Sequence, residues 1–346
     1  MFTSLTARVI YPLQSGRIIL RTDQNWDLNV EADAISTDHT AFEFQISSDR
    51  PYCYFKPCVV DQNGLHWAKG SNYLAIMQMQ RAKEIYPHFF SEPRGSISDA
   101  LAVPSSRALG THYVRIYHPP GYFENTLKRY PVLYMHDGQN LFFPWEAFLG
   151  SEWRVDETME LLDAMNVIDK TLVVGVHPYD RMVEYTQPGY ETYGHFLVEE
   201  LKPRIDANYR TLDGPRNTAI MGSSLGGVVS LYLAWQWPEV FGKAACLSST
   251  FTYRDDLMAR IASEPKRAIE IYLDSGWPGD NYEVTSSMRD LLAKRGYQFG
   301  QDLLYFAFPE ALHHEAYWAM RSHIPFQFFF GKFPSFPSIV AGAEPA

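Results

Sequence analysis

The pattern of hydrophobic and polar positions changes near residue 91, which divides the chain into two parts. In the first part, short apolar runs alternate with polar residues at a period of two, as in 41–46 and 52–56. A third strand candidate lies at 17–22, and turn-forming residues separate the candidates. Several short strands at this spacing are typical of a β-sandwich. We therefore expect residues 1–91 to form a small β-sandwich domain.

From residue 92 onward, strand-like runs alternate with longer helical segments, after a junction rich in proline, serine and glycine. We expect strands at 114–117, 132–135, 171–176, 218–221, 244–248, 269–273 and 304–308. We expect helices at 155–165, 193–207, 225–235 and 284–295. The later strands are apolar throughout, as are parallel strands that are buried on both faces. This alternation predicts an α/β fold with a mostly parallel central sheet over 92–332, followed by a tail at 333–346.

A G-x-S-x-G motif lies at residues 222–226, between the strand expected at 218–221 and the helix expected at 225–235. A serine on such a tight turn is held in a strained backbone conformation with its hydroxyl exposed, which suits a nucleophile. The helix N-terminus also directs free N–H groups toward the place where an oxyanion would form. A glycine-serine turn before a buried helix is the simpler alternative. The flanking elements and the additional Gly227 favour Ser224 as a nucleophile.

A serine hydroxyl needs a general base, and the base needs a carboxylate that orients it. In α/β-hydrolases the chain order is serine, acid, histidine, and the working groups follow the carboxyl ends of strands. Asp274 is the first acid that ends an expected strand after the serine, whereas Asp302 precedes a strand. The loop after the last strand holds His313 and His314, while His323 lies deep in the last helix. We expect Asp274 to be the acid and one of the adjacent histidines to be the base.

An oxyanion hole needs two backbone N–H donors. One is expected from Leu225, which follows the nucleophile. The other is expected from the amide of Gln139, in a turn that Gly138 permits after an apolar strand. The pair His136 and Asp137 invites interpretation as a metal site, but adjacent side chains on a strand diverge. We therefore expect no metal.

The bulk composition narrows the class of protein without indicating a substrate. Among 346 residues, 30 are lysine or arginine and 40 are aspartate or glutamate, so the net charge is −10. This charge argues against a nucleic-acid partner. The 3 cysteines are too few for a disulfide framework, and no run approaches the roughly 18 apolar residues of a membrane span. The N-terminus lacks the pattern of a signal peptide. We expect a cytoplasmic protein with no membrane partner and no cofactor.

Four blocks of sequence resemble the Putative esterase family, which includes enterochelin esterases and feruloyl esterases. The blocks are 129–142, 181–186, 221–227 and 313–318. The resemblance covers about residues 92–332 and implies an α/β-hydrolase fold. The last block is similar to the family's His-x-Glu-Ala-x-Trp segment, in which the first histidine is catalytic. The resemblance therefore implies His313 rather than His314 as the base.

The N-terminal part resembles a starch-binding-like β-sandwich more weakly, through residues 54–58 and 66–72. Enterochelin esterases also carry an N-terminal β-sandwich. Trp26 and Trp67 are candidates for sugar platforms, although aromatic core packing is the simpler interpretation.

These features predict a serine carboxylic-ester hydrolase similar to enterochelin and feruloyl esterases, with Ser224, Asp274 and His313 as its catalytic residues. The same three residues would serve an acyltransferase that replaces water with an alcohol. A carbohydrate-binding protein with a hydrolase scaffold is the alternative from a different class.

We expect Arg181, Tyr185 and Trp318 to bind the substrate, a small-molecule ester with a phenolic, siderophore or sugar part. For Arg181, a structural ion pair, for example with Glu184, is an equal alternative. The sequence leaves the oligomeric state open, a homo-oligomer included.

Overall fold

The computed structural model describes residues 3–77, 83–108 and 110–332. Its contacts divide the chain into two compact units, which are considered separately. Unit 1 combines the chain up to Ser96 with the segments 119–129 and 160–166, and unit 2 holds the rest. The boundary predicted near residue 91 lies close to Ser96, where the chain first passes from unit 1 to unit 2. The two later segments then return to unit 1. The predicted tail lies outside the described residues.

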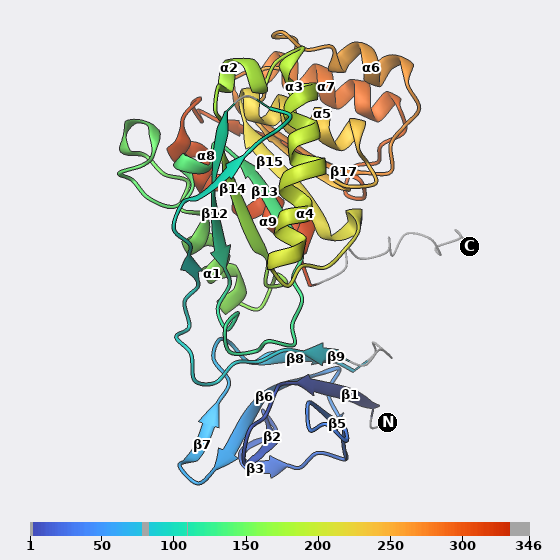
Figure 1. Ribbon diagram of the computed structural model, residues 1–346. Helices are drawn as coiled ribbons and strands as arrows, with labels where there is room; N and C mark the ends of the chain where they lie inside the picture. The colour runs from blue at the N-terminus through green and yellow to red at the C-terminus, as the bar shows by residue number, and fades with distance from the viewer. Residues whose placement is uncertain (1–2, 78–82, 109, 333–346) are drawn as a thin grey trace, which may run out of the picture. The chain divides into compact units, whose positions relative to one another are not determined.

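Unit 1 contains two β-sheets (Figure 1). The first has the order β4-β5-β1-β9 and the second has the order β3-β2-β6-β7, with β8 also paired to β6. The strands are β1 (Thr3–Ile10), β2 (Arg17–Thr22), β3 (Asn25–Val30), β4 (Ala34–Ile35), β5 (Ala41–Ser48), β6 (Tyr52–Asp61), β7 (Gly64–Trp67), β8 (Tyr73–Ile76) and β9 (Lys83–Ile85). All three predicted strands of this part of the chain are present.

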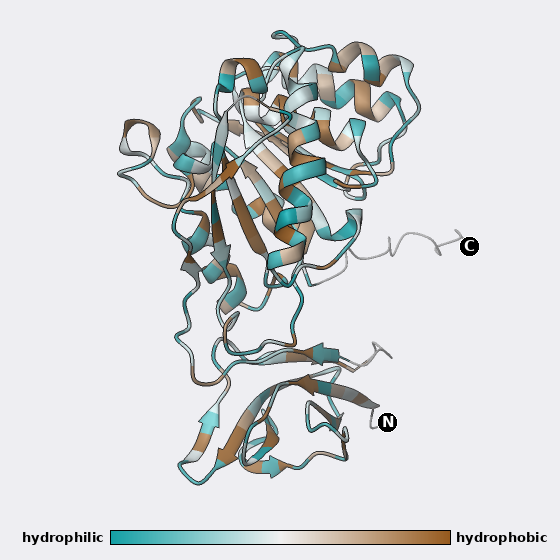
Figure 2. Ribbon diagram, in the orientation of Figure 1, coloured by the Kyte–Doolittle hydropathy of each residue, from teal (hydrophilic) through white to brown (hydrophobic). Residues whose placement is uncertain are grey.

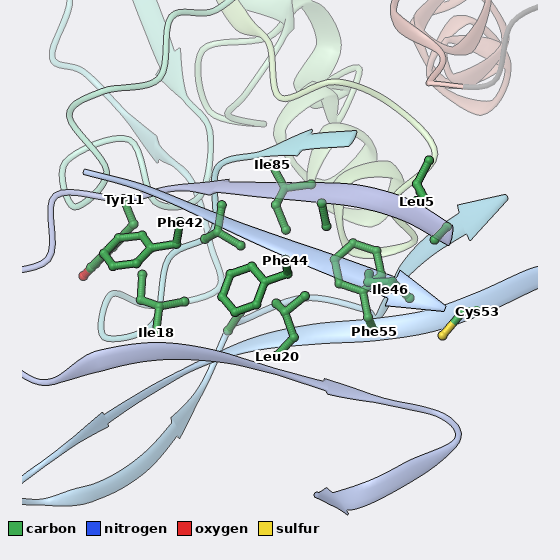
Figure 3. Packing of buried hydrophobic residues seen from close by; sticks show 14 of the residues in the cluster. Leu5, Tyr11, Ile18, Leu20, Phe42, Phe44, Ile46, Cys53, Phe55 and Ile85 are labelled. Atoms are coloured by element: carbon green, nitrogen blue, oxygen red, sulfur yellow. The ribbon is translucent and has the colours of Figure 1, made fainter. Parts of the chain in front are cut away.

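A hydrophobic core lies between these two sheets (Figure 3). Strand β5 alternates between buried and exposed positions, and its Phe42, Phe44 and Ile46 enter the core. Leu20 of β2 and Phe55 of β6 meet them from the other sheet. Because each sheet buries one face against the other, the predicted β-sandwich is confirmed.

Unit 2 is built on a sheet in which β12 is antiparallel to β14 and the strands from β14 to β18 run parallel. The order is β10-β12-β14-β13-β15-β16-β17-β18, with β11 paired to β12. The strands are β10 (Ser96–Ile97), β11 (Leu101–Pro104), β12 (Thr111–His118), β13 (Val132–His136), β14 (Leu172–His177), β15 (Thr218–Ser223), β16 (Lys243–Leu247), β17 (Glu270–Trp277) and β18 (Leu303–Pro309). The central strands β13 and β14 are mostly hydrophobic (Figure 2), because helices cover both faces of the sheet.

The helices connect the parallel strands. They are α1 (Val155–Ala164), α2 (Arg181–Glu184), α3 (Gly189–His195), η3 (Phe196–Leu201), α4 (Lys202–Asn208), α5 (Leu225–Gln236), α6 (Leu257–Ser263), α7 (Tyr282–Lys294), α8 (Glu315–Arg321) and α9 (His323–Phe330), with short turns η1 (Gly138–Asn140), η2 (Phe148–Gly150) and η4 (Pro215–Asn217). In the described part of the chain, no helix has both the length and the apolar character that crossing a membrane requires.

All seven strands and all four helices predicted for the second part of the chain are present. The α/β fold with a mostly parallel central sheet is therefore confirmed. One boundary differs in a way that affects the site. Strand β17 does not end near residue 273 but continues to Trp277, because Ser275 and Gly276, which suggested a turn, remain paired with β18.

Candidate active site

The turn between β15 and α5 holds Ser224 in a strained conformation. Its φ is 56° and its ψ is −121°, a region that residues with side chains rarely adopt. The N–H of Ser224 donates to the carbonyl of Leu247 at the end of the neighbouring strand β16, at 2.9 Å. This geometry agrees with the sequence prediction of a strand-to-helix turn at the serine.

The glycines of the motif allow helix α5 to pass close to the sheet. A Cβ atom on Gly222 would lie 2.6 Å from the backbone carbon of Gly226. A Cβ atom on Gly227 would meet the hydroxyl of Ser249 and would lie 3.2 Å from the Cα of Cys246. Side chains at these positions would push the helix away from β15 and β16, so the turn depends on their absence.

The two expected oxyanion donors lie in the first turns of helical segments that follow strands. Leu225 is the first residue of α5, so its N–H has no intrahelical acceptor. Gln139 lies in η1, and the residue before η1 is Asp137. The φ of 54° and ψ of 48° at Asp137 turn the chain sharply. A Cβ on Gly138 would lie 2.5 Å from the carbonyl carbon of Gly175 on β14, which explains the glycine there. Both segments follow parallel strands and lie at the same edge of the sheet.

His313 lies in the loop between β18 and α8, and its Nδ1 lies 2.6 Å from Oδ1 of Asp280. The edge of its ring packs on Trp318, with ring centroids 5.0 Å apart. The neighbouring His314 instead caps α8, because its Nδ1 accepts from the N–H of Ala316. Of the two adjacent histidines, the structure therefore pairs His313 with a carboxylate.

That carboxylate is not the one predicted from the sequence, and the assignment of Asp274 needs correction. Since β17 runs on to Trp277, Asp274 lies inside the strand rather than beyond its end, with 0% of its surface exposed. Its Oδ2 accepts from the hydroxyl of Tyr272 at 2.8 Å, and its Oδ1 lies 3.1 Å from the guanidinium of Arg321. Asp280 is the acid that follows the true end of the strand.

The two carboxylates also differ in acidity. Burial alone would raise the pKa of Asp280, but hydrogen bonds from His313, Ser248 and the N–H of Gly276 lower it below its usual value. Burial raises the pKa of Asp274 to about 6, although Arg321 and Tyr272 oppose the shift. Asp280 is thus the acid that stays ionised beside the histidine at neutral pH.

The three residues predicted to bind substrate all make contacts within the protein. The Nε of Arg181 lies 2.9 Å and 3.0 Å from the two carboxylate oxygens of Asp137, so Arg181 is paired with Asp137 rather than with Glu184. Tyr185 is completely buried, and its hydroxyl accepts from the N–H of Asp137 at 3.1 Å. It therefore supports the turn that carries Gln139 rather than facing a substrate.

Trp318 is also buried, and its indole N–H donates to the hydroxyl of Ser248 at 2.9 Å. Its other contacts are with His313 and with Trp153, whose ring centroid is 5.8 Å away. Trp318 therefore packs against the histidine loop, and its contact with a substrate stays a prediction.

Sequence reasoning missed Asp280, Ser248 and Arg321. A signal for Asp280 was present, because a Pro-Gly pair at 278–279 precedes it and marks a turn more strongly than the Ser-Gly pair at 275–276. No comparable signal identifies the other two, since their contacts join segments that are far apart in the chain.

Comparisons with known proteins identify the family and the fold of this chain. The Putative esterase family matches residues 106–321. An uncharacterized protein YbbA of Bacillus subtilis is 24% identical over 264 residues, which cover 69% of this chain and 98% of that protein. A solved ferulic acid esterase has a TM-score of 0.58 at 16% identity, over 68% of this chain and 98% of its own. The enterobactin esterase FES from Shigella flexneri has a TM-score of 0.56 at 14% identity, over 95% of this chain and 93% of its own. The two structures share the fold with this chain.

The close approach at the nucleophile turn predicts that Gly222→Ala destabilises the protein. Because its Cβ would meet the backbone of Gly226, we expect a loss of about 1–3 kcal/mol, as for other overpacked sites. The midpoint of urea unfolding measures this loss. Gly279→Ala is the matched control, since its Cβ would have nothing within 4 Å. Equal midpoints for the two variants would contradict the packing argument.

Proposed function

This chain belongs to the Putative esterase family of carboxylic-ester hydrolases, and we propose that it cleaves its substrate through an acyl-enzyme formed on Ser224. His313 is the general base and Asp280 is the acid that orients it. The family match over residues 106–321 includes all three residues, and the three follow the parallel strands β15, β17 and β18 in the chain order of an α/β-hydrolase.

The proposed reaction has two halves. The Oγ of Ser224 attacks the ester carbonyl while Nε2 of His313 takes its proton, and the carbonyl oxygen becomes an oxyanion. The N–H groups of Leu225 and Gln139 stabilise that charge. His313 then gives the proton to the departing alcohol, which leaves an acyl group on the serine. Water then attacks the acyl carbon while His313 takes its proton. His313 returns that proton to Oγ of Ser224 as the bond to the acyl group breaks, which releases the carboxylic acid.

The contact of 2.6 Å between His313 Nδ1 and Asp280 Oδ1 carries this proposal. Because the carboxylate can only accept, Nδ1 must hold the ring proton, which leaves Nε2 free to act as a base. The negative charge of Asp280 then stabilises the imidazolium that forms during the attack. Neither function is available to Asp274, whose carboxylate oxygens face Tyr272 and Arg321.

For the substrate, we propose an ester with an aromatic or extended apolar part. The loops that follow the parallel strands expose large apolar side chains, and these loops meet at the edge that carries the catalytic residues. The exposed residues are Trp145, Phe148 and Leu149 after β13, Tyr179 after β14, Tyr253 after β16, and Leu312 after β18. Solved structures with the same fold include a ferulic acid esterase and an enterobactin esterase.

The proposed roles predict that replacing His313 lowers kcat far more than replacing the adjacent His314. Ser224→Ala and His313→Ala should each lower kcat for p-nitrophenyl acetate by at least about 10³-fold. His314→Ala should lower it far less, because this side chain caps a helix. Steady-state kinetics on proteins with matched circular dichroism spectra test the contrast. A comparable loss from His314→Ala alone would contradict the choice of base.

Replacing Asp280 and replacing Asp274 should have different effects on kcat and on stability. Asp280→Asn should lower kcat by about 10²–10⁴-fold and should also lower stability, because hydrogen bonds from His313, Ser248 and Gly276 favour the ionised carboxylate in the folded protein. Asp274→Asn removes a carboxylate that does not contact His313, and burial already raises the pKa of Asp274 to about 6, so its charge does not stabilise the fold at neutral pH. We therefore expect a smaller loss of kcat and no large loss of stability. Urea unfolding and kinetics on both variants distinguish the roles, and a larger kcat loss in Asp274→Asn would restore the sequence assignment.

The substrate proposal predicts that Trp145→Ala weakens binding of aromatic esters. The side chain is 77% exposed, so its removal should leave folding unchanged and raise KM for a feruloyl ester about three- to tenfold. KM for an acetyl ester should change little. Phe299→Ala is the control, since this exposed aromatic precedes β18 and lies at the opposite edge of the sheet. Equal effects of the two variants would argue against the proposal.

A further inference from the structure

We infer that Ser248 is a positioning residue that holds the Asp280 carboxylate in the orientation required by His313. The inference rests on the proposed function, because it concerns the acid of the proposed triad. Ser248 directly follows β16, one strand away from β17 in the sheet. It belongs to neither the nucleophile motif nor the histidine block, and it does not face the ester.

The hydroxyl of Ser248 is a junction of three hydrogen bonds. Its Oγ lies 2.6 Å from Oδ2 of Asp280, 2.9 Å from Nε1 of Trp318 and 2.5 Å from a terminal nitrogen of Arg321. Ser248, Arg321 and Trp318 are all buried, with exposed fractions of 0%, 3% and 5%. Water therefore has little access to compete for these groups.

The chemistry of the partners fixes the direction of each bond. An indole N–H and a guanidinium can only donate, so Trp318 and Arg321 use the two lone pairs of the Ser248 hydroxyl. Its single proton must then point to Asp280, which can only accept when ionised. The carboxylate is thus held at both oxygens, since Oδ1 accepts from His313 and Oδ2 accepts from Ser248 and from the N–H of Gly276.

Hydrogen bonds also fix the backbone of Ser248. Its N–H donates to the carbonyl of Asp274 at 2.8 Å, and its carbonyl accepts from the side-chain amide of Asn281 at 2.8 Å. Its φ is 45°, a left-handed value that is uncommon for a residue with a side chain. A glycine would adopt this conformation more easily, so the serine is held here at some cost in backbone strain.

Arg321 acquires its position from Asp274. The same terminal nitrogen that reaches Ser248 lies 3.1 Å from Oδ1 of Asp274 and 3.6 Å from Oδ2 of Asp280. A single buried cation therefore lies between two buried carboxylates, and Asp274 keeps it from pairing with Asp280 alone. In this arrangement, Asp274 acts on the triad indirectly, through Arg321 and Ser248.

The test compares two neighbouring buried serines. Ser248→Ala should lower kcat for p-nitrophenyl acetate by about 10- to 100-fold, the value of a hydrogen bond to a charged group, with KM nearly unchanged. Ser249→Ala is the matched control, because Ser249 is also fully buried and its hydroxyl has no hydrogen-bond partner among the described residues. Its kcat should stay within about twofold of the parent.

If Ser248→Ala fails to fold, Ser248→Gly replaces it. This variant removes the same hydroxyl but suits the left-handed backbone, so its folding should suffer less. The expected loss of kcat is the same.

A second readout does not require ester turnover. The Nδ1 proton of a histidine bonded to a carboxylate gives a far-downfield proton NMR signal, which His313→Ala assigns by removing it. This signal should shift or broaden in Ser248→Ala and Ser248→Gly but not in Ser249→Ala. An unchanged signal, or an equal loss of kcat in both serine variants, would overturn the inference. A parent protein that cleaves no ester would refute the proposed function, whereas the NMR signal would still decide the role of Ser248.

Discussion

The close packing of helix α5 against strands β15 and β16 is the constraint on which the catalytic edge of unit 2 depends. Gly222 and Gly227 let the helix approach the backbone of the sheet, and this approach forces Ser224 into its strained conformation. The same turn leaves the N–H of Leu225 free at the helix start. One packing contact thus sets the backbone of Ser224 and leaves a free N–H beside it, and the other residues of the proposed site are brought to this place by other strands.

Three buried carboxylates of unit 2 each have fixed partners. Asp137 has Arg181, Asp274 has Arg321 and Tyr272, and Asp280 has His313 with Ser248. An unpaired buried charge would cost several kcal/mol, so removing one partner affects the next. The pKa of Asp274, raised by burial to about 6, shows that even a paired carboxylate remains costly inside the strand. Asp280, whose pKa is lowered, is better suited to stay ionised beside the histidine.

Much of this arrangement can be predicted from the sequence because it follows from local patterns. The period-two and apolar strands, the helices between them and the nucleophile turn at Ser224 all depend on residues close together in the chain. The choice of His313 over His314 came from a family resemblance, and the structure pairs His313 with a carboxylate. The carboxylate beside His313 is Asp280 rather than the predicted Asp274 for a local reason, since Ser275 and Gly276 look like a turn but pair with β18. The roles of Tyr185, Trp318 and Ser248 could not be predicted, because burial and cross-strand hydrogen bonds depend on segments tens of residues apart.

The central claim is that Ser224 is an activated nucleophile, and covalent labelling tests it most directly. The purified protein is treated with a fluorophosphonate probe, and the modified residue is mapped by mass spectrometry. The account predicts one probe per chain, attached to Ser224 in the folded protein and absent after denaturation. A folded protein that stays unlabelled, or that carries the probe on another residue, would contradict it.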